Sequence, residues 1–255
     1  MMKTIKQLAR TYTKENRFKI LAYAAAFSAV STSVSLVFNS LNLAIIGVVI
    51  SSVIVFLYFV KINEITARIA RGKKLDKQHF LSKPEITKKH GIGFSLYVAL
   101  GLIVFIGLYF GTQIPSIIVL LMLLIAVLFA YVTGVIAMYF EFEETGKNAL
   151  INAFKEGWKE KKLLFHYLFR MLTIIIQGAI LTLCLNVFVF GPQIQKALET
   201  YSSDSPEVLQ YFTNLPATFI QTAGVQVAMF YSVFIGFLIY KTYVFQRKLP
   251  KRRKK

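Results

Sequence analysis

Long apolar runs constrain this chain more than any other feature of its sequence. Six of them occupy residues 19–38, 41–60, 91–110, 116–140, 163–190 and 217–240. A helix of about twenty residues matches the ~30 Å hydrocarbon core of a bilayer. The chain is 56% hydrophobic and only 16% charged, more apolar than a water-soluble domain normally is. The runs therefore predict an all-α integral membrane protein in which residues 1–255 form one polytopic domain with six transmembrane helices.

The connections between the runs predict three helical hairpins. Asn39 and Ser40 leave room only for a tight turn between the first two runs. Residues 111–115 join the third run to the fourth, and Pro115 suits the first turn of a helix because it needs no hydrogen-bond donor there. The fifth and sixth runs are separated by a longer polar stretch that contains Pro192, Pro206 and Pro216. The third hairpin is therefore expected to be the loosest.

The distribution of lysine and arginine predicts the orientation. The segment before the second run contains 6 of them, the connection at 61–90 contains 9, the connection at 141–162 contains 5, and the basic tail at 241–255 contains 8. The other side of the expected membrane holds only Lys196. Because positively charged loops stay in the cytoplasm, both termini are predicted to be cytoplasmic in a multi-pass protein of the cell membrane. The first run follows a basic segment as a secretory signal does, but its length and its direct connection to the second run favour a span.

A net charge of +18 raises the question of which partner the chain binds. On a soluble protein this charge would suggest nucleic acid. Here the charges lie between membrane spans, where they orient the helices and contact anionic lipid head groups. We therefore expect membrane lipids as partners and no nucleic acid.

Amphipathic segments precede the hairpins and are predicted to lie in the cytoplasmic interface. The clearest is residues 147–162, in which Leu150, Phe154 and Trp158 recur every fourth residue and lysines occupy the other faces. These three residues are expected to anchor the helix in lipid or against the bundle. Ile5 and Leu8, and also Ile62 and Ile65, follow helical spacing, three residues apart, before the first and second hairpins.

Few residues in the spans are suited to catalysis. The three carboxylates Glu141, Glu143 and Glu144 cluster at the end of the fourth run, where water can solvate them. The three histidines and the single cysteine have no spacing typical of a metal site, so neither a metal nor a cofactor is expected. The chain is therefore predicted not to be an enzyme.

The remaining polar side chains in the last two spans have two interpretations. Amides in a membrane helix usually hydrogen-bond a neighbouring helix, but they also line polar substrate paths. The amides in question are Gln177, Asn186, Gln221 and Gln226. Arg170, with Lys161 and Lys162 about two turns before it, either reaches back to the interface or contacts a lipid head group.

The segment 139–176 resembles a known pattern. It contains Phe142-Glu143, then Lys147-Asn148-Ala149-Leu150, then Ala153-Phe154-Lys155-Glu156-Gly157-Trp158 and a long apolar run. This order is similar to bacterial polytopic families of unknown function, including YesL-like proteins and the membrane domain of some glycerophosphodiester phosphodiesterases. The resemblance implies an interfacial helix leading into a span and no catalytic residue, because the phosphodiesterase chemistry belongs to a separate soluble domain.

These observations favour a non-enzymatic membrane protein that handles lipid or assists other envelope proteins. The alternative is the permease subunit of a type-2 ABC exporter. Such a subunit has six spans and a longer outer connection before the last one, and residues 191–216 are similar to that connection. That alternative implies an ATPase subunit as a partner.

Overall fold

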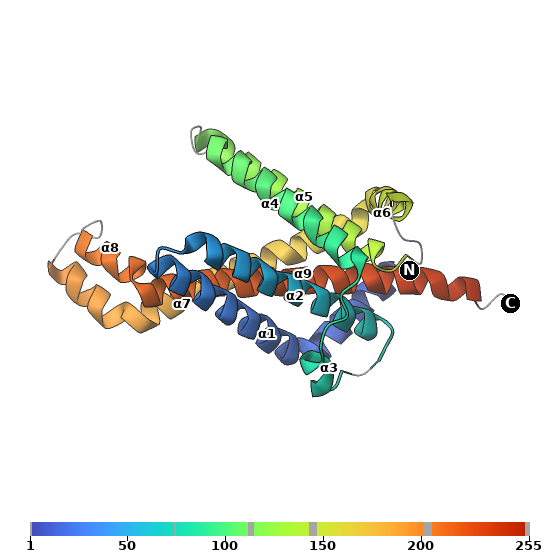
Figure 1. Ribbon diagram of the computed structural model, residues 1–255, viewed down its shortest axis with the longest axis horizontal. Helices are drawn as coiled ribbons and strands as arrows, with labels where there is room; N and C mark the ends of the chain where they lie inside the picture. The colour runs from blue at the N-terminus through green and yellow to red at the C-terminus, as the bar shows by residue number, and fades with distance from the viewer. Residues whose placement is uncertain (1, 74, 112–114, 143–146, 201–205, 253–255) are drawn as a thin grey trace. The chain divides into compact units, whose positions relative to one another are not determined.

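The computed structural model describes residues 2–73, 75–111, 115–142, 147–200 and 206–252 (Figure 1). Its described residues form helices and no strand, which confirms the all-α prediction. The helices are α1 (Met2–Ser40), α2 (Ala44–Ala70), α3 (Lys77–Leu81), α4 (Lys88–Gly111), α5 (Pro115–Tyr139), α6 (Lys147–Lys159), α7 (Lys161–Thr200), α8 (Pro206–Thr213) and α9 (Leu215–Arg252).

Among the described residues, four helices are long and apolar enough to cross a membrane. They are Gln7–Ser40, Ala44–Ala70, Lys161–Thr200 and Leu215–Gln246. Three of them contain an expected span whole, and Ala44–Ala70 contains the expected span 41–60 except residues 41–43, which lie in the turn after α1. The runs at 91–110 and 116–140 fall on α4 and α5, which pack against each other. In α5, the apolar segment Leu123–Tyr139 is shorter than a span, and the side chains at 104–120 lie outside the described part. The architecture is thus compatible with an integral membrane protein.

Several helices extend beyond the apolar runs. The amphipathic segments around Ile5 and Ile62 continue without a break into α1 and α2, whereas the segment around Phe154 forms the separate helix α6. Helix α7 does not end before Pro192 but continues to Thr200. Proline removes one backbone hydrogen bond, and membrane helices tolerate this loss.

The chain divides into two compact units, which are described separately. The first unit comprises Met1–Arg17, Phe56–Leu172 and Val233–Lys255, and the second comprises Phe18–Val55 and Thr173–Ser232. Helices α1, α2, α7 and α9 contribute residues to both units.

An aromatic cluster forms the core of the first unit. The ring of Phe59 in α2 meets Phe140 at 5.6 Å and Phe237 in α9 at 5.5 Å, both edge to face. Such pairs add about 0.5–1.5 kcal/mol each beyond the apolar area that they bury. Near this cluster, two glycines let helices pack closely. A Cβ on Gly134 would overlap the ring of Tyr240, and a Cβ on Gly236 would overlap the ring of Tyr167.

Small residues pack the helices of the second unit. A Cβ on Gly178 in α7 would come within 2.7 Å of the Ala228 Cβ in α9, and one turn later Gly224 of α9 lies against Thr182 of α7. Close approach through small residues is typical of helices that associate in a bilayer.

At the turn between α1 and α2, Asn42 has a φ of 57°, a left-handed conformation that asparagine adopts more readily than most residues.

Candidate functional site

The four amides of the fifth and sixth runs lie in different surroundings. Gln226 packs between helices of the second unit, where its Oε1 accepts hydrogen bonds from Thr32 Oγ1 at 3.2 Å and Ser28 Oγ at 3.5 Å. Ser28 Oγ also donates to the Ala223 carbonyl at 2.8 Å. These bonds join α1 to α9, which is the packing role expected of an amide in a membrane helix.

The other three amides do not join Gln226. Asn186 is only 2% exposed and its Oδ1 has no hydrogen-bond partner among the described residues. Gln177 and Gln221 are exposed, and Gln221 Nε2 donates to the Phe212 carbonyl at 3.1 Å. The structure therefore brings none of these four amides into a hydrogen bond with another.

Helix α6 is positioned by a row of small residues next to its apolar stripe. Ala149, Ala153 and Gly157 are buried, and a Cβ on Gly157 would come within 3.1 Å of Val135 in α5. Tyr131 of α5 donates a hydrogen bond to the backbone carbonyl of Phe154 at 2.9 Å. Helix α6 is thus held against α5 by close backbone approach and by the part-buried hydroxyl of Tyr131.

The predicted anchor residues lie at the edge of this contact, where the rings of Phe154 and Trp158 meet that of Tyr131 at 6.0 Å and 6.1 Å. Leu150 and Phe154 are half-buried, and Trp158 is 63% exposed. The Lys161 ammonium lies 5.1 Å from the centre of the Trp158 ring, within the range of a cation–π contact. Lys162 is exposed beside it, and Arg170 lies half-buried two turns further along α7.

A buried charged cluster in the first unit was not predicted as a site. Its members come from four segments: Asn63, Arg71, His90, Glu141 and Lys241. Lys241 has no exposed side-chain surface, and its Nζ lies 2.9 Å from Glu141 Oε1 and donates to the Asn63 carbonyl at 2.8 Å and to the Asn63 amide oxygen. The second carboxylate oxygen of Glu141 lies 3.6 Å from Arg71. A lysine this deeply buried needs such partners, because an isolated buried charge is costly.

His90 extends the charged cluster to the start of α4. One imidazole nitrogen, Nε2, lies 2.9 Å from the Asn63 side-chain nitrogen, and the other, Nδ1, accepts from the Thr87 backbone N–H at 3.1 Å. Burial, and then the nearby charge of Lys241, lower the pKa of His90 to about 4. At neutral pH the imidazole is therefore uncharged, and the cluster's cations are Lys241 and Arg71.

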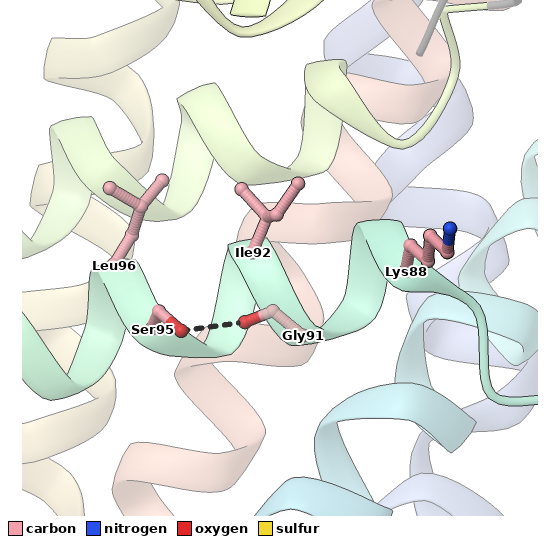
Figure 2. A pocket seen from close by; sticks show the side chains of 5 residues that line it. All are labelled: Lys88, Gly91, Ile92, Ser95 and Leu96. Carbon is pink, nitrogen blue, oxygen red and sulfur yellow. Dashed lines mark hydrogen bonds between the residues drawn. The ribbon is translucent and has the colours of Figure 1, made fainter. Parts of the chain in front are cut away.

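The described surface shows little that resembles a catalytic or metal site. No group of three histidine, cysteine or acidic residues lies together in the described ranges. A hollow along α4 is lined by Lys88, Gly91, Ile92, Ser95 and Leu96 (Figure 2). Ser95 Oγ donates to the Gly91 carbonyl of its own helix at 2.9 Å.

Comparisons with known proteins assign no family to the chain. No family model, no curated protein and no solved structure matches it.

Proposed function

We propose that this chain is a six-span membrane protein, with both termini in the cytoplasm, that binds and handles anionic lipid without catalysing a reaction. The observation that carries the proposal is the placement of α6. Its small-residue face packs on α5. Trp158 meets the Tyr131 ring of α5 edge to face at 6.1 Å yet is 63% exposed, and three lysines, Lys155, Lys159 and Lys161, are exposed.

This combination suits a membrane surface. A tryptophan ring with an apolar body and an N–H group is stable at the level of the lipid head groups. Each lysine near an anionic leaflet contributes about 1 kcal/mol of attraction. Because Lys159 shares its charge with Glu156 at 3.1 Å, Lys155 and Lys161 are expected to contribute most.

The six-span topology rests on helix length and charge distribution. Helices α4 and α5 have 24 and 25 residues, so each spans about 36 Å at 1.5 Å per residue, enough for the hydrocarbon core. If both helices cross the membrane, the four strongly basic segments, which precede the second run and occupy 61–90, 141–162 and 241–255, face the same side of it.

Reporter fusions test this topology. A reporter that is active only in the cytoplasm should be active when fused after Lys255 and inactive when inserted at 202–205, because these sites lie on opposite sides of the last span. A fusion after Lys73 serves as a second cytoplasmic control. The same compartment for both test positions would contradict the six-span arrangement.

The fluorescence of Trp158, the single tryptophan, tests the lipid function directly. In vesicles, brominated phosphatidylglycerol should quench it more strongly than brominated phosphatidylcholine at equal mole fraction, because the anionic lipid gathers at the lysines. Replacing Lys155, Lys159 and Lys161 by glutamine should remove the difference. We expect a roughly threefold or larger preference in the unmodified protein from the attraction of several lysines.

A matched control has the same change of net charge elsewhere. Glutamine at Lys251, Lys254 and Lys255 in the basic tail should leave the lipid preference at Trp158 intact. Emission of Trp158 characteristic of water, or equal quenching by the two lipids in the unmodified protein, would contradict the proposal.

The permease alternative has one supporting observation. Ser82, directly after α3, accepts a hydrogen bond at 2.7 Å from Lys61 Nζ, and Lys61 is buried in α2. This contact ties a short helix to a long apolar helix, as a coupling segment for an ATPase requires. Purification of the chain with a stoichiometric ATPase would favour this alternative over a lipid-binding role.

A further inference from the structure

An open hollow lies along α4 in the first unit. It has a volume of about 600 Å³, and Figure 2 shows the five residues that line it. This volume lies within the range of about 300–1,000 Å³ found for small-molecule sites. The hollow extends from Lys88 to Leu96, a length of about 12 Å at 1.5 Å per residue. It is therefore long enough to hold part of an extended ligand.

The wall of the hollow is apolar. Ile92 and Leu96 contribute hydrocarbon side chains, and Ile92 is 38% exposed. The hydroxyl hydrogen of Ser95 is used within α4, in the bond to the Gly91 carbonyl. Gly91 is exposed, and a Cβ placed on it would meet no atom within 4 Å, so the space beside it is open. These surfaces are complementary to a hydrocarbon chain.

One end of the hollow carries an unpaired positive charge. Lys88 is exposed and forms no ion pair or hydrogen bond with any described residue. The next residue differs, because the Lys89 ammonium donates to the Phe142 carbonyl. The ammonium of Lys88 can therefore bind an anion without losing a partner within the protein.

The order of charge and apolar surface along α4 matches that of a phospholipid. Lys88 belongs to the basic connection at 61–90, which is expected at the cytoplasmic interface. The apolar lining at 91–96 begins the run expected to enter the bilayer. A glycerophospholipid likewise has its phosphate at the interface and its acyl chains beside the spans.

We infer that the hollow on α4 binds an anionic glycerophospholipid, with an acyl chain along Gly91, Ile92 and Leu96 and the phosphate at the Lys88 ammonium. The charge selects an anion, and the apolar wall selects one that carries a hydrocarbon chain. This inference rests on the proposed lipid function and adds a second site, on a different helix from Trp158.

The test uses the full chain in vesicles with a fluorophore beside the hollow. Cys184 is replaced by serine, and Ala99, an exposed residue one turn beyond Ser95, is replaced by cysteine and labelled with bimane. Quenching by brominated phosphatidylglycerol relative to brominated phosphatidylcholine gives the lipid preference at this position. We expect the anionic lipid to be preferred about fivefold, the effect of one lysine near an anionic head group.

Two variants remove the two parts of the site. Lys88→Gln removes the charge and should lower the preference to less than twofold. Gly91→Phe fills the hollow and should do the same, because its ring occupies the place of the acyl chain. Neither position has a close partner, so both variants should fold, and size-exclusion chromatography in detergent checks this. Gly91→Leu is a smaller substitution with the same expected direction.

Matched controls make the same changes away from the hollow. Lys83→Gln removes an exposed positive charge from the same connection. Gly101→Phe places a ring on α4 at a glycine whose Cβ would also meet no atom within 4 Å but which does not line the hollow. Both controls should keep the fivefold preference.

The inference requires both parts of the site. Retention of the preference in a folded Lys88→Gln or Gly91→Phe variant overturns it, because the lipid would then be held without the charge or without the hollow. Loss of the preference in millimolar inorganic phosphate, but not in chloride of equal ionic strength, also overturns it, because the charge would then take free phosphate.

Quenching of Trp158 in the unlabelled protein distinguishes this site from the proposed function. A preference for the anionic lipid at Trp158 with none at Ala99 overturns this inference and leaves the proposed function standing. Equal quenching of Trp158 by the two lipids, with a preference at Ala99 that Lys88→Gln removes, contradicts the proposed role of α6 and supports the site on α4.

Discussion

Replacing Glu141 by leucine should lower the free energy of unfolding by about 3–5 kcal/mol, the cost of leaving a buried cation without its counter-ion. The substitution removes the carboxylate that lies 2.9 Å from Lys241, whose side chain has no exposed surface. The Asn63 oxygens remain, but they carry no full charge. Thermal unfolding in detergent, followed by size-exclusion chromatography, measures the loss.

A double substitution separates the missing charge from the altered packing. Glu141→Leu with Lys241→Met replaces both charges by apolar groups of similar size, and should recover most of the stability that Glu141→Leu loses. Glu156→Leu on α6 is the control, because the Glu156–Lys159 pair is more exposed and is worth about 1 kcal/mol or less. A double variant no more stable than Glu141→Leu would show that the pair is not what stabilises the cluster.

Gly134→Ala should destabilise the protein by about 1–3 kcal/mol, the usual cost of inserting a methyl group into a packed core. The new Cβ would overlap the ring of Tyr240, which is buried and 1% exposed. The Tyr240 ring packs edge to face against Tyr167 at 6.2 Å, and Tyr167 in turn lies against Gly236. Thermal unfolding in detergent measures this effect too.

Gly101→Ala is the matched control for this substitution. A Cβ on Gly101 meets no atom within 4 Å, so alanine there should be neutral or stabilise α4 by up to about 1 kcal/mol. Equal effects of the two substitutions would contradict the close approach of α5 and α9 at Gly134.

The sequence predicted the helices better than their ends. Among the described residues, the four helices that are long and apolar enough to cross a membrane coincide with four of the six expected runs, because backbone hydrogen bonds in lipid have to be made within the helix itself. The observed helix ends differ from the expected ones where the helix continues beyond the end of the apolar run. Helix α7 passes Pro192, and α9 continues from Tyr240 into the basic tail as far as Arg252.

The sequence contained a signal for the charged cluster that we did not use. Glu141 and Lys241 each directly follow the end of an expected span, at residues 140 and 240. In the proposed topology both ends lie on one side of the membrane, which brings these charges of opposite sign to one depth. We interpreted Glu141 as a solvated helix end, whereas its side chain is only 7% exposed and is paired with Lys241.

The sequence by itself determined the all-α class of the chain and the positions of its long helices, since both depend on the composition of continuous segments. Only the tertiary structure decided which polar residues meet. Asn63 and Lys241 are 178 positions apart, and their contact depends on how α2 and α9 are rotated against each other within the first unit. The same holds for α6, where a row of small residues forms the buried face, because small side chains let two helix backbones approach closely.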